Sequence, residues 1–170
     1  VTMPLWASYL VKIYAWRTIL QTNGLLGWAI SPFGLEGPGL TEIANSWLVL
    51  TYLWLPYMIL PVYAGLERIP SSLLEASADL GGRGWITFRR VIFPQLIPAL
   101  AAGSIFTFSL SIGDYIVPDL VSDAKFIGNV IYDNSALGSF PVAAAFSFVP
   151  IVVMIGYLLF ARRLGAFESL

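Results

Sequence analysis

Three apolar segments, each long enough to cross a lipid bilayer as a helix, limit what this chain can fold into. They cover residues 47–66, 91–113 and 142–161, and none of them contains a charged residue. About 20 apolar residues are needed to cross the hydrocarbon core of a bilayer. In lipid every backbone polar group needs a partner within the protein, which for a segment of this length means a helix. The sequence therefore predicts an all-α, polytopic transmembrane helix bundle.

A fourth apolar segment, residues 3–20, carries Lys12 and Arg17 among several aromatic residues. Such a segment is typical of the end of a span that continues along the membrane interface. We therefore expect about four spans or part-spans. The chain begins at Val1 without a leader sequence, which we interpret as a truncated start with N-terminal spans missing. The composition never shifts to that of a soluble domain, so a single transmembrane domain over 1–170 is expected.

The composition excludes several classes of function. Hydrophobic residues make up 58% of the chain and charged residues 11%. The chain has nine basic and ten acidic residues. A net charge of −1 gives no basic field for nucleic acid. The absence of Cys and His removes disulfides, the usual zinc sites and every His-based triad. We therefore predict no enzyme, no catalytic residue, no metal and no cofactor.

The basic residues predict how the chain is oriented in the membrane. Short loops rich in Lys and Arg stay in the cytoplasm. Six of the nine basic residues lie between the first two clear spans or just after the last one: Arg68, Arg83, Arg89, Arg90, Arg162 and Arg163. The loop at about 67–93 and the C-terminal end are therefore predicted to face the cytoplasm.

That loop has the pattern of two short helices. Ser72 and Glu75 have the spacing of a capping box, and Gly81 or Gly82 then supplies a left-handed residue that ends the first helix. Residues 85–92 place aromatic and apolar side chains at helical spacing before the next span. From spacing alone, the loop is equally well interpreted as a solvated connector that shields the bundle.

The order of residues in the loop resembles the signature of ABC importer permeases, which is Glu-Ala-Ala, three residues, Gly, nine residues, Ile, any residue, Leu, Pro. The chain has Glu75-Ala76-Ser77, three residues, Gly81, nine residues and Val91-Ile92-Phe93-Pro94. Ser77, Val91 and Phe93 depart from the family, and each departure is conservative in size.

This resemblance implies a permease subunit in the bacterial inner membrane, in contact with membrane lipid. In that family the loop forms coupling helices that dock on the ATP-hydrolysing subunit. By resemblance, Glu75, Ala76 and Gly81 form the coupling surface, and Asp79 lies one turn after Glu75. The implied partners are a dimer of ATP-binding subunits, a second permease subunit and a periplasmic or extracellular substrate-binding protein.

Four further stretches resemble the spermidine/putrescine type of these permeases: residues 10–16, 23–25, 60–63 and 113–120. The family usually has Arg where Lys12 stands and a longer loop after Asp119. The resemblance implies a polyamine as substrate, with iron or sulfate as alternatives. A membrane scaffold that uses the loop only to bind a partner is another alternative. An ion-driven carrier is disfavoured because the three clear spans contain no charge.

Two carboxylates, Asp114 and Asp119, flank Tyr115 at the predicted outer end of the second span. An ionisable group beside the membrane is a candidate for function. Both carboxylates could guide a cationic amine, to which Tyr115 would add a cation–π face. The alternative is that they are hydrated and cap local turns.

Aromatic residues form a stripe along the first clear span. Trp47, Trp54, Tyr57 and Pro61 follow each other at roughly helical spacing. Trp54 and Tyr57 are therefore candidates for lining a substrate path. An interfacial aromatic belt and helix packing are the more frequent reasons for such residues.

Overall fold

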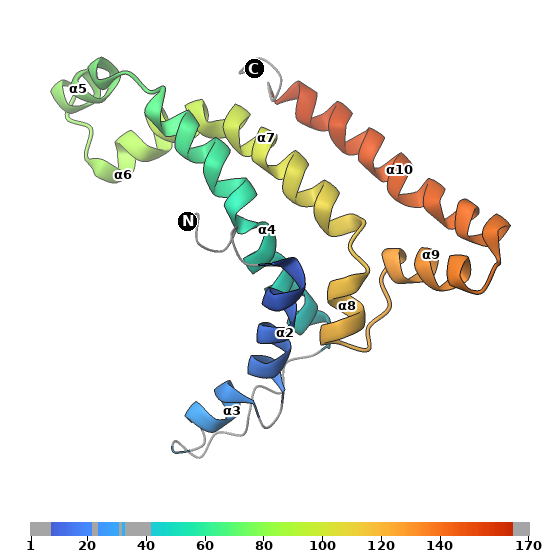
Figure 1. Cartoon of the computed structure of the whole chain (residues 1–170). Helices are drawn as coiled ribbons and strands as arrows, with labels where there is room; N and C mark the ends of the chain where they lie inside the picture. The colour runs from blue at the N-terminus through green and yellow to red at the C-terminus, as the bar shows by residue number, and fades with distance from the viewer. Residues whose placement is uncertain (1–7, 22–23, 31, 33–41, 165–170) are drawn as a thin grey trace. The chain divides into compact units, whose positions relative to one another are not determined.

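The computed structural model describes residues 8–21, 24–30, 32 and 42–164, and this part of the chain is helical without strands (Figure 1). The elements in chain order are α2 (Tyr9–Leu20), α3 (Leu25–Ile30), α4 (Glu42–Glu67), α5 (Ser71–Asp79), α6 (Gly84–Thr87), the π-helical turn η2 (Phe88–Ile92), α7 (Phe93–Ile112), α8 (Ile116–Val121), α9 (Ile127–Ala136) and α10 (Phe140–Arg163). The predicted all-α class is confirmed.

Three helical stretches within the described residues are long and apolar enough to cross a membrane. They run over Ile43–Glu67, Gly84–Ile112 and Phe140–Arg163, with mean hydropathies of 1.5, 1.7 and 2.3. Each contains nearly all of one predicted apolar segment and extends beyond it, so the three predicted spans are confirmed. In the fourth segment the described part is α2, whose 12 residues measure about 18 Å at ~1.5 Å per residue. That length falls short of the ~30 Å core, which fits a part-span or interfacial helix.

The chain divides into two compact units, which we describe separately. Unit 1 comprises Val1–Pro56 and Leu110–Val152, and unit 2 comprises Tyr57–Ser109 and Val153–Leu170. The boundaries fall inside α4, α7 and α10, so each of these long helices contributes to both units.

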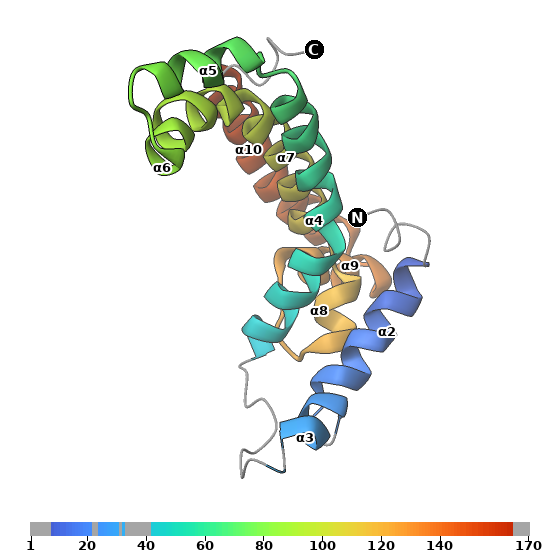
Figure 2. The same ribbon diagram turned by 90° about the vertical axis from the view of Figure 1, so that its left-hand side faces the viewer.

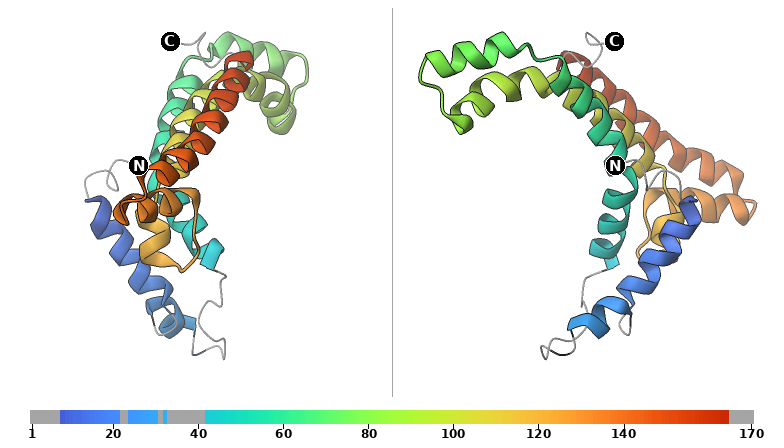
Figure 3. Two further views of the ribbon diagram at one scale, coloured as in Figure 1. Left: turned by 90° about the vertical axis from the view of Figure 1, so that its right-hand side faces the viewer. Right: turned by 60° about the vertical axis from the view of Figure 1, so that its left-hand side comes forward.

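The core of unit 1 forms where α2, α4 and α8 meet. Ile13, Val49 and Val117, one from each helix, have no exposed surface. Figure 3 shows α2 and α8 side by side, and the two helices are in contact. A 2.7 Å hydrogen bond between Ser46 Oγ and Ser122 Oγ ties the start of α4 to the end of α8. These contacts hold the short helices near the N-terminal part of α4.

Small residues set the packing of α4 against α7 in unit 2. A Cβ added at Gly103 would lie 2.9 Å from Met58 Sδ and 3.3 Å from Met58 Cα. A Cβ at Gly65 would lie 2.7 Å from Ala99 Cβ. Glycine and alanine let helix backbones approach closely in lipid, where van der Waals contact replaces the hydrophobic effect as the main attraction.

Polar and aromatic contacts join α10 to α7 within unit 2. Tyr157 Oη donates a 2.6 Å hydrogen bond to Ser104 Oγ, and the rings of Tyr157 and Phe108 lie 4.5 Å apart. A hydrogen bond between membrane helices contributes roughly 0.6–2 kcal/mol. One tyrosine thus contributes both an aromatic and a polar contact to this helix pair.

Candidate functional site

The predicted cytoplasmic loop folds into a helical hairpin, formed by α5, a tight turn, α6 and η2, which we call the loop hairpin. Figure 2 shows α5 and α6 lying side by side within it. Helix α5 begins at Ser71, with Pro70 in extended conformation as its N-cap and no side-chain cap. The predicted capping box of Ser72 and Glu75 is therefore wrong. Pro70 fixes its own φ near −65°, and the helix starts directly after it, so that Ser72 lies inside the first turn.

The end of α5 is a Schellman motif. The Gly82 N–H donates to Ser77 O at 2.8 Å, and the Gly81 N–H donates to Ala78 O at 2.9 Å. Gly81 has a φ of 76°, in the left-handed region that a residue without Cβ adopts readily. The predicted glycine end of the helix is confirmed, and Gly81 is the left-handed residue.

The second half of the loop hairpin continues directly into the next span. α6, η2 and α7 form one uninterrupted helical stretch over Gly84–Ile112. The rings of Trp85 and Phe88 stack at 5.7 Å, and Phe88 lies 6.2 Å from Phe93. A helical run was predicted here. The continuity of this run with α7 through a π-helical turn was not predicted, because a proline such as Pro94 is typical of the first turn of a helix. In the structure Pro94 lies ten residues into the Gly84–Ile112 stretch, at an interior position that membrane helices tolerate.

The surface of α5 and the turn is open, and it is rich in apolar side chains. Glu75 and Asp79 are exposed, and neither forms an ion pair with any residue that the structure describes. Leu80 is 90% exposed and Trp85 71% exposed. An exposed cluster of large apolar side chains beside unpaired carboxylates is typical of a surface that a protein partner covers.

Asp114 lies at the centre of a hydrogen-bonded cluster in unit 1. Its Oδ2 accepts a 2.6 Å hydrogen bond from Tyr9 Oη, and its Oδ1 accepts the N–H groups of Ile116 and Val117 at 3.0 and 3.1 Å. Asp114 thus caps the first turn of α8 and anchors α2.

Tyr115 and Asp119 lie beside this cluster. The ring of Tyr115 stacks on Tyr132 with 4.3 Å between centroids. Asp119 is more exposed than Asp114, and its carboxylate lies 3.5 Å from Lys125 Nζ. Lys125 also donates a 3.1 Å hydrogen bond to Asp133, and this bond is the main reason that the pKa of Lys125 is raised.

The two aromatic candidates of α4 differ in their surroundings. Trp54 is half-buried, and its ring stacks on Tyr9 at 6.0 Å, so that it forms part of the unit 1 core. Tyr57 belongs to unit 2 and is 39% exposed. The position of Trp54 therefore favours packing, one of the two interpretations of the aromatic stripe.

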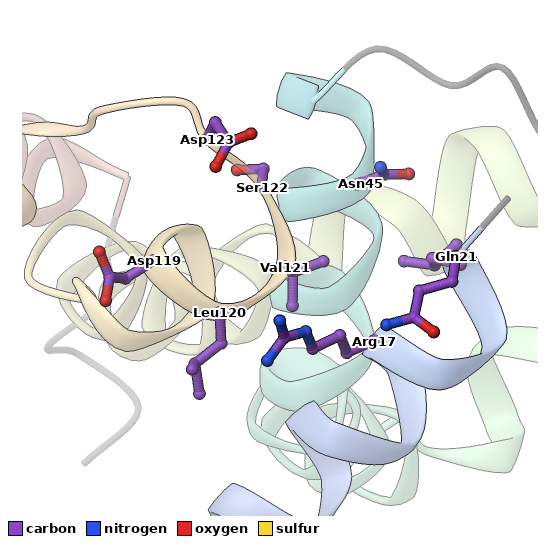
Figure 4. A pocket seen from close by; sticks show the side chains of 9 residues that line it. Arg17, Gln21, Asn45, Asp119, Leu120, Val121, Ser122 and Asp123 are labelled. Atoms are coloured by element: carbon purple, nitrogen blue, oxygen red, sulfur yellow. The ribbon is translucent and has the colours of Figure 1, made fainter.

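A polar pocket of about 530 Å³ opens between α2, α4 and α8 in unit 1 (Figure 4). It is lined by Arg17, Leu20, Gln21, Asn45, Asp119, Leu120, Val121, Ser122 and Asp123. Figure 4 shows the Arg17 side chain reaching from α2 toward Leu120 and Val121. The pocket thus carries charges of both signs, and it includes Asp119 among the predicted pathway residues.

Several contacts that organise these sites were not predicted from the sequence. Tyr9 holds Asp114, and Asn129 is buried, where its Nδ2 donates to Tyr115 O at 2.9 Å. Ser77 and Thr87 share a hydrogen bond inside the loop hairpin. These residues carry no local pattern, because their partners lie between 10 and 105 positions away in the chain. Within the described residues no group of three or more acidic side chains could hold a metal ion.

Several known proteins similar to this chain are permeases. It is 50% identical over 187 residues to the inner membrane ABC transporter permease protein YdcU of Escherichia coli (strain K12), an alignment that covers 100% of the chain and 59% of YdcU. It is 34% identical over 167 residues to the spermidine/putrescine transport system permease protein PotB of Haemophilus influenzae, covering 94% of the chain and 58% of that PotB. PotB of Escherichia coli (strain K12) is 33% identical over 158 residues.

The chain spans a little under three fifths of the length of these relatives. Residues 2–167 match a family described as the inner membrane component of binding-protein-dependent transport systems. The match includes the three membrane-spanning stretches and the loop hairpin. On this evidence the chain belongs to the family of binding-protein-dependent transport system inner membrane components, which are ABC transporter permeases.

Proposed function

We propose that this chain forms the path of an ABC importer for a polyamine, with ATP hydrolysed by separate subunits. The observation that carries the proposal is the loop hairpin, in which the signature residues lie on an open surface beside a membrane-spanning stretch. The spermidine/putrescine names of the PotB relatives, at 33–34% identity, support a polyamine as the substrate. YdcU is more similar, and its name specifies no substrate.

The loop hairpin is proposed to couple ATP hydrolysis to transport. Glu75, Ala76 and Asp79 lie on α5, and Gly81 sets the direction of the chain after it. Their exposure supports a role in docking on the dimer of ATP-binding subunits. A second permease subunit and a substrate-binding protein complete the proposed transporter. The remainder of 1–170 is proposed to act with the hairpin as one membrane domain.

Tyr115 and Asp119, which lie beside the Asp114 cluster, are proposed to contribute to the substrate path. Asp114 is already held by Tyr9 and two backbone N–H groups, which favours a structural role for it. Asp119 is exposed, and its ion-pair partner among the described residues is Lys125, at 3.5 Å. An exposed carboxylate near an aromatic face can attract an ammonium group.

Uptake by the assembled transporter tests this proposal. Vesicles that contain the full-length permease with its ATP-binding and binding-protein partners should accumulate labelled spermidine or putrescine only when ATP is supplied. Asp119→Asn should raise the KM for the polyamine severalfold, because one attractive charge is lost. Uptake of iron or sulfate without polyamine uptake would contradict the proposed substrate, and an unchanged KM would contradict the role of Asp119. A protein that takes up no solute would be a scaffold.

A further inference from the structure

The loop hairpin contains a polar contact between its two arms. Ser77 Oγ on α5 and Thr87 Oγ1 on α6 share a hydrogen bond of 2.8 Å. Both residues are half-buried, although most of their neighbours in the hairpin are exposed. Serine and threonine inside helices commonly bond to the backbone of the preceding turn. Here the two hydroxyls bond to each other across the hairpin.

Gly82 completes the same contact from the turn. Its N–H donates to Ser77 O at 2.8 Å. A Cβ at Gly82 would overlap Ser77 Oγ and would lie 2.6 Å from Ser77 O and 3.0 Å from Thr87 Oγ1. A Cβ at Gly81 or Gly84 would have no atom of the described chain within 4 Å. Position 82 must therefore be glycine for the two hydroxyls to meet, whereas position 81 favours glycine for its left-handed φ.

This contact lies between the surface of α5 and a membrane-spanning stretch. Thr87 is the last residue of α6, which continues through η2 into α7 without interruption. Helix α5 is connected to that stretch by the turn at residues 80–83, by the hydroxyl pair and by packing contacts with α6 and η2. Without the pair, α5 could change its angle to α6 by bending the glycine-containing turn.

We propose that Ser77 and Thr87 are positioning residues that lock α5 to α6, so that a displacement of α5 moves α7 with it. This inference rests on the proposed function, since α5 is the surface on which the ATP-binding subunit is proposed to act. Ser77 stands where the permease signature has its second Ala, so the hydroxyl lock is a feature of this chain and goes beyond the signature itself. The hydrogen bond needs both hydroxyls, which makes the proposal testable by single and double substitutions.

A distance measurement in the assembled transporter tests the lock directly. Residues 1–170 contain no Cys, so nitroxide labels at Ser71→Cys and Arg89→Cys, in a transporter whose other cysteines are replaced, report the separation of α5 from η2. With the lock intact we expect a single narrow distance distribution. In Ser77→Ala, the fraction of molecules whose label distance lies outside that narrow distribution should rise roughly fivefold, as expected for the loss of one hydrogen bond. Thr87→Ser keeps a hydroxyl and should keep the narrow distribution, as should the control Ser72→Ala on the exposed side of α5. Unchanged distributions in both Ser77→Ala and Thr87→Val would overturn the lock.

The number of substrate molecules imported per ATP provides a second readout. Ser77→Ala and Thr87→Val should each lower this ratio while ATP hydrolysis continues, and the double variant should be no worse than either single variant. Additive losses in the double variant would overturn the proposal. The label distances do not depend on any substrate. A transporter that fails to import polyamines would therefore contradict the proposed function, and the distances would still decide the lock.

Discussion

At the scale of single residues, Asp114 is a carboxylate whose hydrogen bonds all serve the fold. Asp114 is near a predicted membrane boundary and was a candidate for guiding a cation. Three donors already contact it: Tyr9 Oη and the backbone N–H groups of Ile116 and Val117. The sequence could predict that an Asp before a short helix caps it. It could not predict Tyr9 as a partner, because 105 positions separate the two residues.

Tyr9→Phe is predicted to destabilise unit 1. The substitution keeps the ring that stacks on Trp54 and removes the hydrogen bond to Asp114. Hydrogen bonds to charged groups contribute roughly 1.5–3 kcal/mol, and the partial exposure of Tyr9 favours the low end of that range. Thermal unfolding of the purified full-length permease should show a lower Tm than wild type. Tyr14→Phe, on an exposed face of α2, is the matched control and should leave the Tm unchanged. Equal Tm values for Tyr9→Phe and wild type would contradict the role of this contact.

At the scale of elements, long apolar helices were predictable and their contacts were not. Length and the lack of charge were enough to place the three spans, because lipid permits few structures other than helices there. The two ends of α5 show how far the bounds of a helix can be predicted from the sequence. Its glycine end follows from Gly81 and was predicted. Its start was misplaced because Ser71 and Ser72 are adjacent and only the position of Pro70 decides which residue begins the helix. Which small residues face a neighbouring helix cannot be read from segments that are apolar on every side.

Gly103→Val is predicted to separate α4 from α7. A Cβ at Gly103 would already lie 2.9 Å from Met58 Sδ, and the two methyl groups of valine need more space still. Overpacking of this kind typically costs about 1–3 kcal/mol. The Tm of the full-length permease in detergent should therefore fall. Gly156→Ala is the matched control, since an added Cβ there meets no atom of the described chain within 4 Å. A Gly103→Val variant as stable as Gly156→Ala would contradict the close contact.

At the scale of the whole molecule, the sequence was most informative where it matched a signature and least informative about the substrate. The order from Glu75 to Pro94 identified the family, and the match over residues 2–167 agrees with it. Glu75, Ala76 and Gly81 belong to the signature and lie on the loop hairpin, and Asp79 lies one turn after Glu75, but exposure alone does not define what binds there. The substrate depends on the complete path, whereas the chain spans a little under three fifths of its relatives.

The central claim is that the loop hairpin couples ATP hydrolysis to transport through this permease, and Glu75→Ala tests it most directly. Glu75 is exposed on α5 and has no ion-pair partner within the described residues, so its loss should leave the fold of this chain intact. ATP-driven uptake of labelled spermidine and putrescine should be measured with wild type, Glu75→Ala and the control Tyr14→Phe, which lies on an exposed face of α2 outside the loop hairpin. The account predicts at least a tenfold loss of uptake for Glu75→Ala, with the subunits still assembled, and wild-type uptake for Tyr14→Phe. Wild-type uptake by Glu75→Ala would contradict the claim.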